Sequence, residues 1–201
     1  MRATRAAIMA GGRGTRMGGP KAAVELAGRP LIAYPIATVR DAGLEPVVVA
    51  KSGSALPALD CEVLIEPDEP VHPLAGIVAA LEALGEPLVG IACDLPLLPA
   101  SLIVALAARE APLVIPADPS PQPLVARWDP ALLGRLRTAT ATGAPLVRLV
   151  AELGATAIAG AELRAFGEPA EMFANVNDPG GLALAERLLG RQSGTSSTRA
   201  L

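Results

Sequence analysis

The stretch that decides the fold lies near the amino terminus and reads Ala6-Ala7-Ile8-Met9-Ala10-Gly11-Gly12-Arg13-Gly14-Thr15-Arg16-Met17-Gly18-Gly19-Pro20-Lys21. Its first four residues are an apolar run that predicts a buried strand. The turn that follows holds five glycines, which let backbone N–H groups approach an anion closely. Arg13, Arg16 and Lys21 add positive charge that suits phosphate oxygens. The stretch therefore predicts a strand that leads into a phosphate-binding loop.

Two common phosphate motifs are excluded in this loop. A Walker loop needs Gly-Lys-Ser/Thr at its end, whereas Lys21 follows Pro20 and precedes Ala22. A dinucleotide fingerprint needs a third glycine at the position that Met17 occupies. A glycine-rich surface turn with scattered cations is the alternative that the loop alone leaves open.

The composition limits the classes of protein and of partner. The chain has 201 residues, of which 51% are hydrophobic and only 2% aromatic, so its core must be aliphatic, as in parallel sheets covered by helices. A net charge of −3 offers no basic surplus for a nucleic-acid backbone. Cys61 and Cys93 have no metal-binding spacing and indicate reduced, buried thiols. With no signal peptide and no apolar run of membrane-spanning length, we expect a cytoplasmic protein without membrane partners.

Short aliphatic runs alternate with helical patterns along the rest of the chain. Strands are expected at 46–50, 61–65, 88–92, 112–116, 122–128 and 156–158, with a further extended segment at 173–178. Helices are expected at 30–42, 72–84, 102–108, 132–140, 145–153 and 181–189. This order predicts a three-layer α/β/α fold around a mostly parallel sheet. We expect a single domain over residues 1–189 and a disordered tail over 190–201.

Polar residues follow the expected strands where open α/β sheets place their ligands. Lys51 and Ser52 follow the second strand, and an acidic loop that includes Asp68 follows the third, although solvated loops explain both equally well. Asp94 follows the central strand 88–92 and is the expected anchor of a magnesium ion. Asn175 and Asn177 are expected on one face of the extended segment, with helix capping as the alternative for Asn177. His72, the sole histidine, is expected to be structural and not catalytic.

These segments, taken together, resemble a known family. Gly-Gly-x-Gly-Thr-Arg-Met-Gly-x-x-Lys resembles the signature loop of nucleotidyltransferases with a Rossmann-like, GT-A-like fold, specifically the MobA-like group that includes molybdenum cofactor guanylyltransferases. Further matches, in the family's order, are Pro73-Leu74-Ala75-Gly76, the Cys-Asp-x-Pro-x-Leu-Pro run from Cys93, Gln122-Pro123-Leu124, and Phe-x-Asn-x-Asn-x-Pro from Phe173. The resemblance covers residues 6 to about 189.

The resemblance implies an enzyme that transfers GMP from GTP to the phosphate of molybdopterin and releases pyrophosphate. It implies catalytic roles for Arg16, Lys21 and Asp94, and Mg²⁺ held by Asp94 and Asn177. Arg13 is assigned to the rim. Contacts with molybdoenzymes or their chaperones are implied partners. The implied nucleotide-binding residues are Met9, Ala10, Gly11, Gly12, Gly14, Lys21, Ser52, Asp68, Leu74, Gly76 and Asp94.

Three positions depart from the family pattern and keep alternatives open. Pro20 stands where the family has Asp, and His72 stands where it has Gly. Asp178 stands where the family has a small polar residue, which makes it a candidate for an extra carboxylate ligand of the metal. Pro-Lys is more typical of sugar-1-phosphate nucleotidyltransferases. The alternatives are therefore a molybdopterin cytidylyltransferase, a sugar-1-phosphate nucleotidyltransferase, or a non-catalytic nucleotide-binding protein.

Overall fold

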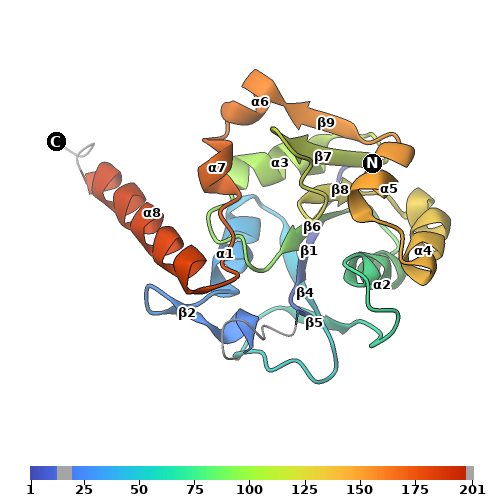
Figure 1. Cartoon of the computed structure of the whole chain (residues 1–201), viewed down its shortest axis with the longest axis horizontal. Helices are drawn as coiled ribbons and strands as arrows, with labels where there is room; N and C mark the ends of the chain where they lie inside the picture. Colours follow the sequence, from blue (N-terminus) through green and yellow to red (C-terminus); the bar gives the residue numbers. More distant parts are fainter. Residues whose placement is uncertain (13–19, 198–201) are drawn as a thin grey trace.

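A seven-stranded sheet forms the centre of the molecule, in the order β5-β4-β1-β6-β8-β7-β9 (Figure 1). The computed structural model describes residues 1–12 and 20–197, and side chains as far as residue 191. The strands are β1 (Arg5–Met9), β4 (Glu45–Ala50), β5 (Glu62–Ile65), β6 (Leu88–Ala92), β7 (Leu113–Ala117), β8 (Ala126–Trp128) and β9 (Thr156–Ala159). Most neighbours pair in parallel, and β8 is antiparallel to both β6 and β7.

Helices cover both faces of the sheet, which confirms the expected α/β class with three layers (Figure 1). One face carries α1 (Ala33–Asp41) and α3 (Ala100–Ala108), and the other carries α2 (Ala75–Leu84), α4 (Leu133–Thr142) and α5 (Leu146–Glu152). The short helices α6 (Gly160–Arg164) and α7 (Pro169–Met172) follow β9. The buried side chains of both interfaces are almost all aliphatic, as the composition predicts.

The direction of the strands brings their carboxyl ends to one edge of the sheet. Because β8 runs antiparallel to both β6 and β7, these two strands are parallel to each other. The chain therefore leaves β5, β4, β1, β6 and β7 at the same edge, and the residues that follow these strands line that edge.

Several element boundaries differ from the sequence-based expectation. The first helix begins at Ala33, not at Pro30, because Arg29–Pro30 forms β3 and pairs with β2, Glu25–Leu26. The expected strand 122–128 is reduced to its last three residues, since Val125 N donates to Gln122 O in a turn. No strand forms within residues 173–178, which are all described, so the expected extended strand there is wrong. Val176 N instead donates a single hydrogen bond to Asp94 O.

The last helix, α8 (Pro179–Ser197), is longer than expected. It begins two residues earlier than predicted and continues past Leu189, so the expected helix end is wrong, and residues 198–201 lie outside the described part. Its first half packs Leu182, Ala185 and Leu189 against Leu26, Leu31 and Val176. Beyond that contact the helix projects from the body of the molecule (Figure 1).

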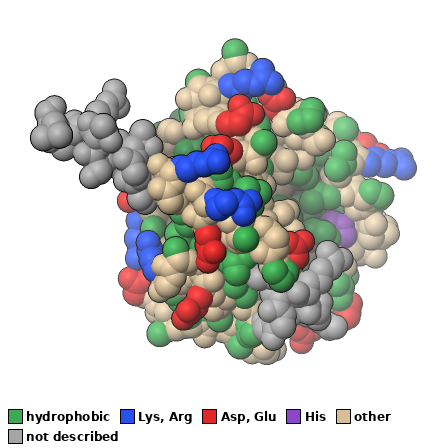
Figure 2. All heavy atoms as spheres, turned by 60° about the vertical axis from the view of Figure 1, so that its left-hand side comes forward, with side chains coloured by type: hydrophobic (Ala, Val, Ile, Leu, Met, Phe, Trp, Pro, Cys, Tyr) green, Lys and Arg blue, Asp and Glu red, His purple; other side chains and the backbone are tan. Residues whose placement is uncertain are grey.

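The surface carries acidic and basic side chains side by side, with hydrophobic side chains between them (Figure 2). The face shown has no extended patch of one charge, in keeping with the near-balanced composition. Among the described residues, no helix combines the length and the apolar character that crossing a membrane requires.

Candidate nucleotide-binding and metal site

Three side chains from distant parts of the chain meet at the carboxyl edge of the sheet. The Lys21 ammonium donates to Asp94 Oδ2 at 2.5 Å and to Asn177 Oδ1. The side chains of Lys21 and Asp94 are 15% and 17% exposed, so the ion pair is largely withdrawn from solvent. One ammonium is thus held between a carboxylate and an amide oxygen that both point to the same place.

The local backbone explains why these three residues meet. Lys21 opens a short 3₁₀ helix, Lys21–Ala23, which follows the glycine-rich loop. Asp94 comes two residues after the central strand β6, where Cys93 N donates to Met9 O of the neighbouring strand. The hydrogen bond from Val176 N to Asp94 O fixes the segment that carries Asn177. The predicted metal-binding pair is therefore brought together across the molecule.

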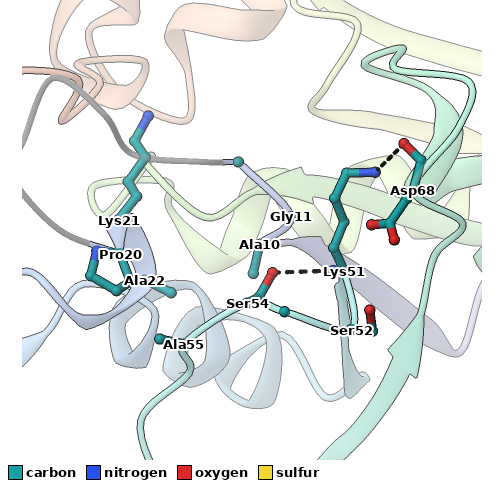
Figure 3. Close-up of a pocket in the computed structure, with 12 residues that line it drawn as sticks. Ala10, Gly11, Pro20, Lys21, Ala22, Lys51, Ser52, Ser54, Ala55 and Asp68 are labelled. Carbon is teal, nitrogen blue, oxygen red and sulfur yellow. Dashed lines mark hydrogen bonds between the residues drawn. The ribbon is translucent and has the colours of Figure 1, made fainter.

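The glycine-rich loop borders a cavity of about 530 Å³. Figure 3 shows Lys21 and Lys51 on either side of Ala10 and Gly11. Lys51 Nζ donates to the carbonyl of Asp68 at 3.0 Å (Figure 3) and to the carbonyl of Pro67 at 2.9 Å. The cavity is lined by Ala10, Gly11, Gly12, Pro20, Lys21, Ala22, Lys51, Ser52, Gly53, Ser54, Ala55 and Asp68. Five described residues that the sequence assigned to the nucleotide, besides Lys21, thus line one cavity: Ala10, Gly11, Gly12, Ser52 and Asp68.

Glu66 is a candidate that the sequence reasoning missed. Its side chain is 11% exposed and lines an adjoining cavity of about 330 Å³, together with Met9, Lys51 and Asp94. A Cβ atom on Gly11 would lie 2.0 Å from Glu66 Oε1, and one on Gly76 would lie 2.9 Å from Oε2. In this orientation the carboxylate fits because both neighbours are glycine. Burial raises the pKa of Glu66, an effect that Lys51 partly offsets.

The carboxylate of Glu66 lacks a close hydrogen-bonding partner among the residues that the structure describes. Its nearest charged neighbour is Lys51 Nζ, 3.9 Å from Oε1. No local pattern marks this residue, because its position after an edge strand looks like any solvated acidic loop. Only the strand order, with β5 beside β4 and β4 beside β1, brings Glu66 to face Gly11.

His72 has the structural role that the sequence predicts. Its Nδ1 accepts from Leu74 N at 3.1 Å, and its Nε2 lies 2.9 Å from Ala144 O. With Nδ1 as acceptor, Nε2 carries the hydrogen and donates to that carbonyl. The ring thereby ties the turn before α2 to the loop between α4 and α5, and α2 begins at Ala75 and not at residue 72.

Other predicted residues lie apart from the two cavities or outside the described residues. Leu74 is fully buried in the core between α2 and the sheet, and Gly76 is buried in the first turn of α2. Cys93, by contrast, lines the 330 Å³ cavity beside Asp94, and burial raises the pKa of its thiol to about 12, so it stays neutral and unreactive. Arg13, Gly14 and Arg16 lie outside the described residues.

The donor set at Asp94 and Asn177 fits a hard divalent cation. A carboxylate oxygen and an amide oxygen converge where the Lys21 ammonium now sits, which shows that the place favours positive charge. Mg²⁺ typically takes one or two protein oxygens and completes its shell with water and phosphate. The described residues form no cluster of three or more His, Cys, Asp or Glu side chains, so a richer protein cage is absent from them. The Asp178 carboxylate instead caps the start of α8, because its Oδ1 accepts from Gly181 N at 2.8 Å.

Comparison with known proteins identifies relatives along nearly the whole chain. The model of the family described as "MobA-like NTP transferase domain" matches residues 6–157. A molybdenum cofactor guanylyltransferase from Rhodobacter capsulatus is 36% identical over 193 residues, which cover 89% of this chain and 93% of the relative. One from Shewanella amazonensis is 31% identical over 183 residues, covering 87% and 91%.

Two solved structures share the fold of this chain. Molybdopterin-guanine dinucleotide biosynthesis protein A from Archaeoglobus fulgidus aligns with a TM-score of 0.79 at 24% identity, covering 93% of this chain and 99% of that one. A 2-C-methyl-D-erythritol 4-phosphate cytidylyltransferase from Thermus thermophilus aligns with a TM-score of 0.67 at 20% identity, covering 94% and 99%. At these identities the likeness concerns the fold alone.

Proposed function

The chain belongs to the MobA-like NTP transferase family, and we propose that it transfers GMP from GTP to the phosphate of molybdopterin, releasing pyrophosphate. The observation that carries the proposal is the meeting of Lys21, Asp94 and Asn177 beside the glycine-rich loop. A cation site and an ammonium group next to a cavity of nucleotide size are what nucleotidyl transfer needs.

The proposed reaction is a single in-line displacement. An oxygen of the acceptor phosphate forms a bond to the α-phosphorus, and the bond from the α-phosphorus to the bridging oxygen breaks. The electron pair of that bond leaves on pyrophosphate. The acceptor phosphate is already an anion at neutral pH, so the protein needs no general base to activate it. Its task is to align the reactants and to offset the repulsion between their charges.

The residues of the site divide this task. Backbone N–H groups near Gly11 and Gly12 bind phosphate oxygens, and the Lys21 ammonium offsets charge that develops on the leaving pyrophosphate. Arg16, outside the described residues, is assigned the same charge-offsetting role. Asp94 and Asn177 would hold Mg²⁺, which when bound offsets negative charge on the phosphates.

Glu66 supports guanine in preference to the pyrimidine bases. Guanine presents two adjacent donors, its ring N1–H and its 2-amino group, and an ionised carboxylate accepts both. Neither cytosine nor uracil offers that pair of donors on adjacent atoms. Because Glu66 is largely buried and faces the cavity between Gly11 and Gly76, we assign it to the guanine edge.

The test of the proposed function compares Asp94→Ala with the wild-type protein. Calorimetric titration of GTP, CTP and UTP with Mg²⁺ is expected to show selective GTP binding that weakens at least about tenfold in the variant, because a charge-assisted contact is lost. Pyrophosphate release with GTP and molybdopterin is expected to fall by about a hundredfold or more.

Asp60→Ala is the matched control, because Asp60 pairs with Arg40 on the surface with a side chain 76% exposed. Preference for CTP or UTP would favour the cytidylyl or sugar-nucleotide alternatives. Nucleotide binding without any pyrophosphate release in the presence of acceptor would identify a binding protein without transferase activity.

A further inference from the structure

Lys51 is a cation of the site that the proposed reaction leaves without a role. It lines both cavities, as do Gly11, Gly12 and Lys21, so it stands where the two cavities adjoin. Its side chain is only 19% exposed, although an unpaired ammonium strongly favours water. The groups that the ammonium contacts therefore indicate what it does.

The backbone holds Lys51 and Glu66 side by side at the ends of neighbouring strands. Glu66 N donates to Ala50 O at 2.9 Å, which extends the parallel pairing of β4 with β5 by one residue. Lys51 N donates to Ser54 Oγ at 3.2 Å, and Ser54 N donates back to Lys51 O at 3.0 Å. Both residues therefore leave the sheet from a fixed backbone, and only their side chains remain to be positioned.

The Lys51 ammonium is committed to the acidic loop. Two of its three hydrogens go to carbonyl oxygens, those of Pro67 at 2.9 Å and of Asp68 at 3.0 Å. The side chain accordingly extends toward Asp68 (Figure 3). A lysine that binds phosphate needs an ammonium that is free to donate, so these contacts favour a role in holding the loop.

The same ammonium faces Glu66 without occupying its carboxylate. Nζ lies 3.9 Å from Glu66 Oε1, which is beyond hydrogen-bonding distance but close enough for a charge interaction between two largely buried groups. Lys51 therefore favours the ionised carboxylate and leaves its oxygens available to a ligand. A direct hydrogen bond would instead compete with the donors of a bound base.

We propose that Lys51 is a positioning residue for guanine recognition, which holds the loop from Glu66 to Asp68 and keeps the Glu66 carboxylate charged and turned toward the base. The proposal rests on the proposed function, in which Glu66 accepts from the N1–H and 2-amino groups of guanine. It gives the two lysines of the chain different tasks, with Lys21 acting at the phosphates and Lys51 at the base.

The charge interaction with Lys51 makes guanine binding depend on pH. Burial raises the pKa of Glu66, Lys51 lowers it, and Asp68 raises it. Without the ammonium the pKa of Glu66 is higher, and a larger share of the carboxyl is protonated at a given pH. A protonated carboxyl presents an O–H donor at one oxygen, so it no longer accepts both guanine donors. The other ionisable side chains that line this cavity are Lys21, His72 and Asp94, which a substitution of Lys51 leaves in place.

The test measures the binding of GTP and ITP to the full chain by calorimetry with Mg²⁺. ITP lacks the 2-amino group, so the wild type is expected to prefer GTP by about tenfold or more. Lys51→Met keeps the length of the side chain but removes the ammonium, and it is expected to reduce that preference to about twofold or less. Lys51→Arg keeps the charge and the donors and is expected to restore most of the preference.

Two further measurements separate positioning of Glu66 from a general effect on the fold. The preference for GTP over ITP should fade at a higher pH in Lys51→Met than in the wild type, because Glu66 loses its charge earlier as pH falls. In a Glu66→Gln background, Lys51→Met should change the preference no further. Lys51→Gln removes the charge but keeps amide donors for the loop carbonyls, so it takes the place of Lys51→Met if that variant does not fold.

Arg137→Met is the matched control, because it removes a cation whose side chain is 61% exposed and pairs with Glu82. Equal weakening of GTP and ITP binding in Lys51→Met would show that Lys51 binds phosphate and would overturn the proposal. A preference that is present in the wild type and unchanged in the uncharged Lys51 variants would also overturn it, with the proposed function left standing. A wild-type protein that binds CTP or UTP as tightly as GTP would overturn the proposed function and this proposal with it.

Discussion

Glu66 illustrates at the residue scale how a buried carboxylate lowers stability at neutral pH. Its burial raises its pKa, so the folded state holds the proton more tightly than the unfolded chain does. Stability from this group is therefore fully present below the ordinary glutamate pKa of about 4.3 and is lost as pH rises through the raised value. At neutral pH the buried, ionised carboxylate therefore lowers the free energy of unfolding. Such a cost is common for groups at functional sites.

The variant Glu66→Gln is expected to separate these two effects. At pH 7 its Tm should exceed that of the wild type by on the order of 1–2 °C, and the difference should shrink as pH falls below about 4.3, measured by thermal unfolding across pH. Its affinity for GTP should fall about tenfold, because an amide cannot accept both guanine donors.

Glu62→Gln, at an exposed position of β5, the strand that Glu66 follows, is the matched control and should alter neither property. An unchanged preference for GTP over ITP, which lacks the 2-amino group, would remove Glu66 from the guanine site. A Tm difference that grows toward low pH would contradict the direction of its pKa shift.

At the scale of elements, β6 is the strand on which the site depends. It lies between β1 and β8, is buried along almost its whole length, and delivers Asp94 to the sheet edge. Gly90 at its centre allows α2 to pack closely, because a Cβ there would lie 2.5 Å from Ile77 Cδ1 and 3.4 Å from the Trp128 ring. The glycine is thus required by packing and not by an unusual backbone conformation.

Gly90→Ala is expected to reduce the free energy of unfolding by about 1–3 kcal/mol, because the added methyl group forces Ile77 or Trp128 to move. Chemical denaturation measures the effect. Gly134→Ala is the control on α4, where a Cβ meets nothing within 4 Å and a helical alanine should stabilise by about 0.5–1 kcal/mol. Equal and small effects of both substitutions would show that α2 does not pack tightly on β6.

At the scale of the whole molecule, α8 near the end of the chain packs against the β2–β3 region near its beginning. Ala185 is fully buried against Leu26 and Leu31 of the β2–β3 region and against Val176. The same contacts hold the segment that presents Asn177 to Lys21. The first half of α8 therefore supports both the fold and the site.

Ala185→Asp is expected to lower Tm by more than about 5 °C, because it buries an unpaired charge in an apolar cluster. Deletion of residues 192–201 should change Tm by less than about 1 °C and leave GTP binding intact. Differential scanning calorimetry with and without GTP distinguishes these outcomes. A large loss of stability on the deletion would mean that residues 192–201 contribute to the fold.

The sequence by itself determined the class of fold and much of the chemistry. Strands such as Leu88–Ala92 were predictable because short aliphatic runs between turn residues have few other stable states. The phosphate loop, Asp94 and Asn177 were predictable as candidates because their residue types follow strands and match a family pattern. The start of the first helix was not predictable, because Arg29–Pro30 pairs with Glu25–Leu26 as a strand although its sequence suits a helix.

Only the tertiary structure decided which candidates meet. Lys21 and Asn177 are 156 positions apart, and no local pattern in either segment predicts that Lys21 contacts both Asn177 and Asp94. The position of Glu66 between Gly11 and Gly76, and the contacts of Lys51 with the loop after Glu66, likewise arise from the order of strands in the sheet. The physical reason is that local propensity depends on neighbours along the chain, whereas a binding site depends on contacts that form only when distant elements pack.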